Sequence, residues 1–205
     1  LLLSLLLAAQ CFALNSISIL TNEDNLNNAI SRQAITDVQS LLGQACSCEV
    51  GINQRRADIY LQLPKIEAAY MERPSRFEAA ADYPYLHVPN HDYSWVSEPA
   101  KGGIYLNLKA YSYKGISDGL YGLLQEQLGF LFYHPRETFI PKLTEWPLPD
   151  NFEWEAIARF DKKGFHLHTQ HPLELTEPLL NHEFEGGLAM VKEYIDWLAR
   201  NGQNY

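Results

Sequence analysis

The chain has 205 residues and a formal net charge of -9 at pH 7, with 46% hydrophobic and 20% charged residues. This composition is typical of a globular protein with an ample core and argues against an intrinsically disordered chain. The negative charge argues against nucleic acid or an anionic membrane surface as the main partner. The densest basic groups are only Arg55-Arg56 and Lys162-Lys163.

The first thirteen residues carry no charge and are mostly apolar. They are too few to span a bilayer. They fit the apolar region of a secretory signal that is cut after Ala13, with Cys11 at the third position before the cut. We therefore expect a periplasmic or secreted protein, with no stable membrane insertion after signal removal. The alternative is a buried N-terminal strand or helix.

Cys46 and Cys48 would remain after such cleavage, separated by one residue. A disulfide between such close neighbours is strained, so a reduced pair and a pairing outside this segment stay open as alternatives. A structural zinc site is not indicated, because this is not the usual spacing and no matching cysteine pair occurs elsewhere.

Three regular elements are predicted in the first third of the chain. Residues 16–20 alternate as a strand, residues 25–42 form an amphipathic helix that ends at Gly43, and residues 57–63 form a strand that Pro64 ends. The apolar face of the helix is expected to consist of Leu26, Ile30, Ala34, Val38 and Leu41. Residues 65–100 contain four prolines and are predicted to be a loop-rich excursion, with a hairpin as the alternative.

A strand over 104–108 is predicted to lead into a helix over 117–128. Ser117 is the expected N-cap, Asp118 lies near the positive helix end, and Gly129 suits the left-handed residue that closes the helix. The leucines at 120, 124 and 128 recur every four residues and predict one apolar face. A short aromatic strand then ends at His134-Pro135.

The stretch from Gly115 to Glu137, a helix followed by an aromatic strand, resembles the small α/β domain that precedes the catalytic barrel in the hexosaminidase and α-glucuronidase families. The predicted fold class is α/β: an α+β accessory domain with a mixed sheet and a helix layer, followed by the first strand-helix unit of a TIM-type β/α barrel. The resemblance implies a glycoside hydrolase that acts on complex glycans.

The chain is expected to divide into the signal remnant at 1–13, the accessory domain at 14–150 and the start of the barrel at 151–205. A proline-rich, linker-like stretch, 135–149, precedes the boundary. The barrel part is predicted to hold one strand within 158–172 and a helix over 188–200. A barrel needs eight such repeats in about 250 residues, so we expect this chain to be an inactive N-terminal part of the enzyme.

Substrate contacts are expected where the first barrel strand ends, because β/α barrels place their reactive groups at the C-terminal ends of the strands. The candidates are His168, Gln170 and His171, with Thr169 beside them. The related families carry Arg-Gly, Asp and Arg-His on this strand, where the present chain has Lys163-Gly164, His168 and His171-Pro172. The catalytic carboxyls are expected beyond Tyr205, and the nearby acidic loop residues Glu174, Glu177, Glu183 and Glu185 are expected to be solvated.

Two other functions remain as alternatives. The pair His166-x-His168 places two imidazoles on one side of a strand and could bind a divalent metal in a β/α-barrel hydrolase, with further ligands from His171 and His182. A non-catalytic glycan-binding or structural module is the second alternative. Aromatic side chains could stack on sugar rings, but packing is the preferred interpretation for Tyr83, Tyr85, Tyr93, Trp95 and Trp146. The sequence contains no nucleotide-cofactor fingerprint, so no cofactor is expected.

Overall fold

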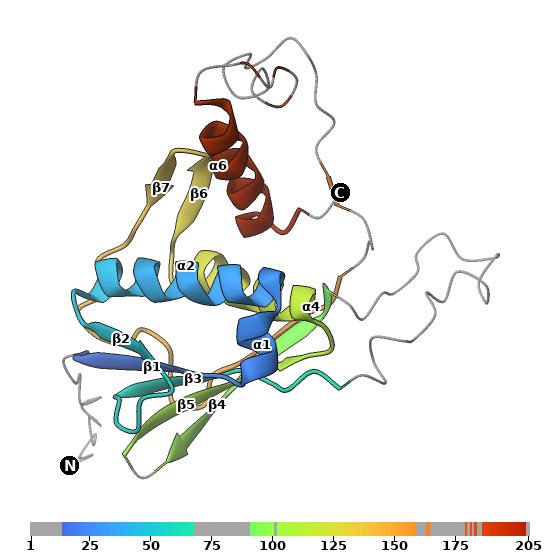
Figure 1. Ribbon diagram of the computed structural model, residues 1–205. Coiled ribbons are helices and arrows are strands. Elements are labelled where there is room, and N and C mark those ends of the chain that lie inside the picture. The colour runs from blue at the N-terminus through green and yellow to red at the C-terminus, as the bar shows by residue number, and fades with distance from the viewer. Residues whose placement is uncertain are drawn as a thin grey trace, which may run out of the picture.

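The computed structural model describes residues 14–67, 91–100, 102–158, 163–164, 179, 181, 183 and 186–203. These residues form an α/β fold in which a mixed sheet is covered by helices on one side, as the sequence predicts (Figure 1).

The central sheet has six strands in the order β2-β1-β3-β5-β4-β8. The neighbours from β2 to β5 are parallel, whereas β4 is antiparallel to both β5 and β8. The strands are β1 Ser16–Leu20, β2 Glu49–Ile52, β3 Ile59–Gln62, β4 Tyr93–Ala100, β5 Gly103–Ala110 and β8 Glu153–Ala156.

Helices pack above this sheet, and a hairpin and a further helix follow. The layer consists of α1 Glu23–Asn27, α2 Ala29–Cys46 and α4 Tyr113–Gly122, and α4 continues into a π-helical turn, η3, Leu123–Gln127. The hairpin pairs β6 Leu131–His134 with β7 Glu137–Phe139. Helix α6, Gly187–Arg200, lies beside this hairpin (Figure 1).

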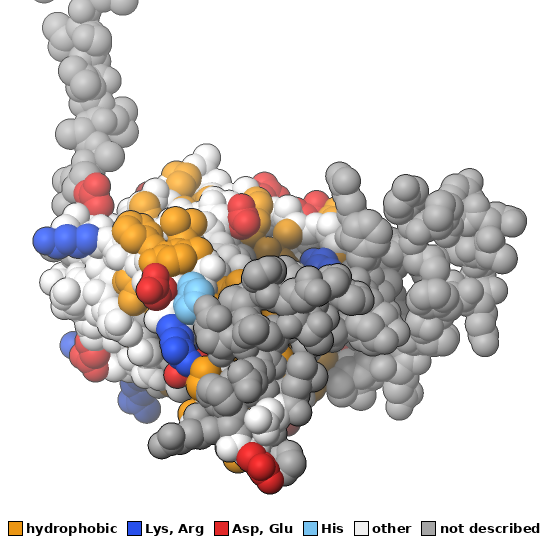
Figure 2. Space-filling model, turned by 90° about the horizontal axis from the view of Figure 1, so that it is seen from above, with side chains coloured by type: hydrophobic (Ala, Val, Ile, Leu, Met, Phe, Trp, Pro, Cys, Tyr) orange, Lys and Arg blue, Asp and Glu red, His pale blue; other side chains and the backbone are white. Residues whose placement is uncertain are grey.

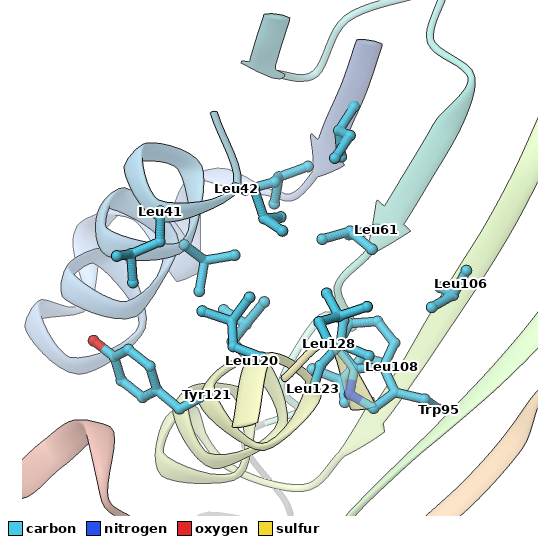
Figure 3. Packing of buried hydrophobic residues seen from close by; sticks show 14 of the residues in the cluster. Leu41, Leu42, Leu61, Trp95, Leu106, Leu108, Leu120, Tyr121, Leu123 and Leu128 are labelled. Atoms are coloured by element: carbon cyan, nitrogen blue, oxygen red, sulfur yellow. The ribbon is translucent and has the colours of Figure 1, made fainter. Parts of the chain in front are cut away.

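The core lies between the sheet and the helix layer. The parallel register places Ile19 beside Leu61, and Leu61 beside Leu106, so that these side chains share one face of the sheet. Leu120 and Trp95 are fully buried in the same cluster (Figure 3). Every second residue of a strand points to this face. The alternating pattern predicted for the strands therefore places their apolar side chains in the core.

The predicted helix over 25–42 is two helices in the structure. Asn28 breaks it, because the extended backbone of this residue lets its side chain accept hydrogen bonds from the amides of Ile30 and Ser31 and so begin α2. Helix α2 also runs past Gly43 to Cys46. Ile30 is 47% exposed, so its predicted place on the buried face is wrong.

Cys46 and Cys48 form a disulfide, the first of the three alternatives that the sequence leaves open. The left-handed backbone of Ser47, with φ 52°, turns the chain between them. It brings their Cα atoms to 5.0 Å, within the range of about 4.4–6.8 Å that disulfides occupy.

Helix α4 begins earlier than predicted. Ser112, not Ser117, is its N-cap, and the Ser112 hydroxyl accepts a hydrogen bond from the amide of Gly115 at 2.9 Å. Ser117 and Asp118 are therefore buried inside the helix. The predicted left-handed closure is confirmed, with Gly129 at φ 80°.

Two stretches predicted to be irregular belong to the folded domain. The segment 93–100, part of the predicted loop-rich excursion, is strand β4. In the stretch predicted to be linker-like, Leu143 and Leu148 are buried, and the amide of Leu143 donates to the carbonyl of Ala45. Strand β8 pairs with β4, so the sheet extends past the expected boundary at residue 150.

The corrected start of α4 can be tested by capping substitutions. Ser112→Ala is expected to lower the free energy of unfolding by about 1 kcal/mol, because the amide of Gly115 loses its acceptor. Ser40→Ala, at an exposed position within α2, is the control and is expected to change stability by less than about 0.5 kcal/mol. Urea unfolding measures both. Equal effects of the two substitutions would contradict the assignment of the cap.

Candidate functional site

A recess of about 210 Å³ lies where the helix layer and the start of β4 meet the end of α6. Its residues come from the start of β4, from α4 and η3, from the segment after β8 and from the C-terminal end of α6. It is lined by His91, Tyr93, Asp118, Tyr121, Gly122, Gln125, Glu126, Ile157, Ala158, Lys163, Arg200, Asn201 and Gly202.

Asp118 is the buried charge at this recess, with its side chain 7% exposed. One carboxylate oxygen accepts from Nδ1 of His91 at 2.8 Å, and the other is paired with the ammonium group of Lys114. Lys114 lies one helical turn before Asp118, which keeps the two side chains on the same side of α4. A buried carboxylate is costly without such partners, so the pairing explains why Asp118 is tolerated inside the fold.

Tyr93 lies against the glycine face of α4. A Cβ atom on Gly122 would come within 2.2 Å of the Tyr93 hydroxyl oxygen, so only glycine fits at this contact. Burial raises the pKa of Tyr93 above its ordinary value, and the negative charges of Asp118 and Glu126 raise it further. The phenol is therefore a neutral hydrogen-bonding group at physiological pH.

Asp37 joins α6 to the rest of the domain. Its Oδ2 accepts from Nε of Arg200 at 2.8 Å and from the hydroxyl of Tyr121 at 3.0 Å. Burial, followed by the charge of Asp37, raises the pKa of Tyr121. Burial alone would lower the pKa of Arg200, but the hydrogen bond to Asp37 and the charge of this carboxylate raise it overall.

Neutral hydrogen bonds complete the attachment of α6. The carbonyl oxygen of Phe132 in β6 accepts from Nε1 of Trp197 at 2.7 Å and from Nδ2 of Asn201 at 3.0 Å. Nε2 of Gln125 donates to Oδ1 of Asn201 at 3.2 Å. The end of α6 is thereby held by both the hairpin and η3.

The residues predicted to contact substrate, His168, Gln170 and His171, lie outside the described residues, as does the alternative metal ligand His166. Thr169, Glu174, Glu177, His182 and Glu185 also lie outside them. Glu183 is exposed, as expected for a solvated carboxyl. Within the part of the chain that the structure describes, no group of three metal-ligating side chains comes together, and no helix is long and apolar enough to cross a membrane.

The recess itself is not among the sites predicted from the sequence. From the sequence, Asp118 is expected to lie near the positive end of the helix that Ser117 caps, and its pairing with His91 depends on a contact across 27 residues that only the fold creates. The spacing of Lys114 and Asp118 is the one local signal for this pair. Of the aromatic residues expected to pack, Trp95 is fully buried and Tyr93 and Trp146 are partly buried against the core, which confirms packing for these three. Tyr93 also lines the recess, and Tyr83 and Tyr85 lie outside the described residues.

No protein-family model matches this chain, and no curated protein matches it in sequence. Among solved structures, the chain is similar to a family GH115 4-O-methyl-α-glucuronidase with specificity for decorated arabinogalactans. The TM-score is 0.55 at 10% sequence identity, and the similarity covers 94% of this chain and 25% of that enzyme. The chain thus has a fold like that found in a glycoside hydrolase, and it spans a quarter of that protein's length.

The link between Asp37 and Arg200 can be measured by a double-mutant cycle. Their side chains are 16% and 19% exposed, and we expect Asp37→Asn and Arg200→Gln to show a coupling of about 1.5–3 kcal/mol in urea unfolding. The matched control is the more exposed pair Lys192–Asp196, for which we expect about 0.3–0.5 kcal/mol. If the two couplings were equal, Asp37 would not be what holds α6 to the domain.

The buried phenols predict an alkaline loss of stability. Tyrosine ordinarily ionises near pH 10, and burial raises the folded-state pKa of Tyr93 and Tyr121 above that value. Above about pH 10 the unfolded chain releases these protons while the folded chain keeps them, so the free energy of unfolding should fall as the pH rises. Both phenols are neutral in either state at pH 7, where they should contribute no pH dependence.

The alkaline slope is measured by urea unfolding from about pH 8 to about pH 11. Tyr93→Phe should reduce the slope, because it removes one of the shifted groups. Tyr133→Phe, at a residue that is 60% exposed, should leave it unchanged. An identical slope in both variants would rule out a buried Tyr93 phenol as its source.

Proposed function

We propose that this chain is the N-terminal part of an exported glycoside hydrolase that acts on complex glycans. It supplies the accessory α/β domain and the first strand-helix unit of a β/α barrel, and the catalytic carboxyls lie in the remainder of the enzyme. The observation that carries the proposal is the structural similarity to an α-glucuronidase over 94% of this chain but only 25% of that enzyme.

The arrangement at α6 supports a barrel start. In a β/α barrel each strand is followed by a helix whose axis lies outside the sheet, and the chemistry occurs at the C-terminal ends of the strands. Helix α6 follows the segment 158–172 in which the first strand is predicted, and its end is fixed to the accessory domain through Arg200 and Asn201. The accessory domain would thus hold the strand-helix unit by the C-terminal end of α6, at the end of the barrel away from the predicted substrate contacts.

Export has two independent supports. The first thirteen residues have the apolar character of a secretory signal. Cys46 and Cys48 form a disulfide, and disulfides persist mainly in oxidising compartments such as the periplasm and the extracellular space.

The proposal predicts a difference between the chain and the complete gene product. The purified 205-residue chain should hydrolyse no aryl glycoside, because a glycosidase needs a pair of carboxyls that flank the scissile bond, and this pair is assigned to the rest of the protein. The complete protein should release sugar from glycans, and decorated arabinogalactans, the substrates of the similar glucuronidase, belong in the panel. Reducing-sugar release and chromatography of the products measure both.

Clear turnover by the chain alone would contradict the proposed position of the catalytic carboxyls. No turnover by the complete, folded protein on a broad glycan panel would contradict the glycosidase assignment. Elemental analysis of the same samples tests the alternative. Near-stoichiometric zinc, manganese or iron that is lost in a His166→Ala, His168→Ala variant would favour a metal-dependent hydrolase instead.

A further inference from the structure

Most charged groups around the recess are already paired, and Glu126 is the exception in the part of the chain that the structure describes. Asp118 is paired with His91 and Lys114, and Arg200 is paired with Asp37. Lys163 also has an interaction partner. An anionic ligand would have to compete with the existing pairs and would face the negative charge of Glu126, whereas a neutral, hydrogen-bonding ligand would meet neither obstacle.

Hydrogen-bonding groups outside these pairs line one side of the recess. Among the described residues, neither the Tyr93 hydroxyl nor the Glu126 carboxylate has a hydrogen-bond partner. The amide nitrogen of Gln125 is used by Asn201, which leaves its carbonyl oxygen as an acceptor. A phenol, a carboxylate and an amide oxygen that face one small space are suited to the hydroxyl groups of a sugar.

An unusual backbone presents two of these groups. Gln125 and Glu126 lie in η3, where the amide of Leu128 bonds to the carbonyl of Leu123 in the wider π pattern. π-helical turns are rare and are found frequently at functional sites. Leu123 and Leu124 are the two buried core residues of this turn, so its first half packs on the core while Gln125 and Glu126 lie on its less buried side.

The size of the recess limits the ligand. A dry cavity of about 150 Å³ is large enough for a benzene ring. The recess measures about 210 Å³, which accommodates one six-membered ring with hydroxyl substituents. It is smaller than the pockets of about 300–1,000 Å³ that bind drug-sized ligands. It opens to solvent beside exposed Glu126, so a longer glycan could continue outward from a bound ring.

We infer that this recess binds one neutral pyranose residue of a glycan through Glu126, Gln125 and the Tyr93 hydroxyl. The inference rests on the proposed function for the class of ligand, and it adds a binding site where α4, η3 and the start of β4 meet the end of α6. Seen from the α6 side, hydrophobic side chains gather in one cluster, with acidic, basic and histidine side chains beside it (Figure 2).

The test is a titration of the ¹⁵N-labelled 205-residue chain with neutral methyl glycosides of glucose, galactose and xylose. The glycosides are added to about 50 mM, a concentration that saturates a site with a millimolar Kd. At least one of them should shift the NMR signals of the backbone amides of residues 122–126 and 201–203. Glu126→Gln should weaken that binding about tenfold, because a hydrogen bond to a charged carboxylate becomes a weaker one to a neutral amide oxygen. Glu153→Gln, the same change at an exposed residue of β8, should leave Kd unchanged.

Two results would overturn the site. One is the absence of shifts at these amides for all three glycosides. The other is binding whose Kd is the same in Glu126→Gln as in the unaltered chain. Both readouts use the chain alone and need no hydrolysis, so a failure here is distinct from a failure of the proposed enzymatic function, which is judged on the complete protein.

Discussion

A single carboxylate, that of Asp37, joins three helices that are far apart in the sequence. It lies on α2, accepts a hydrogen bond from Tyr121 of α4, and pairs with Arg200 at the end of α6. Arg200 also lies over the ring of Phe132 in the hairpin, with its guanidinium carbon 5.7 Å from the ring centroid. Without this charge, Arg200 would be a largely buried cation without its observed partner, which is costly. The position of α6, and with it one wall of the recess, depends on Asp37.

The sheet and the helix layer could be predicted because they follow from local patterns. Alternation identified residues 16–20 and the strand around Ile59, and the apolar periodicity identified α6 to within one residue of its start. These signals are local, since each depends on which side chains face a common core. The same reasoning gave the wrong helix ends. Ser112 and Asn28 are the N-caps of α4 and α2, and neither is the residue that the apolar pattern indicates as the start.

The remaining differences have non-local causes. Strand β4 contains Pro99 and charged Glu98 near its end, and it is stabilised by pairing with β5 on one side and β8 on the other. The recess depends on contacts between residues separated by 27 to 163 positions, such as His91 with Asp118 and Asp37 with Arg200. No local window of sequence contains both partners. The predicted substrate contacts at His168, Gln170 and His171 stay predictions, because they lie outside the described residues.

The central claim, that this α/β domain begins a glycoside hydrolase, is tested most directly by the coding sequence downstream of Tyr205. The account predicts several further strand-helix repeats, with a pair of carboxyl residues at the C-terminal ends of later strands. A stop codon directly after Tyr205 would contradict it and would leave a non-catalytic module. Repeats whose strand ends carry additional histidines and aspartates instead would contradict the glycosidase chemistry and favour a metal-dependent hydrolase.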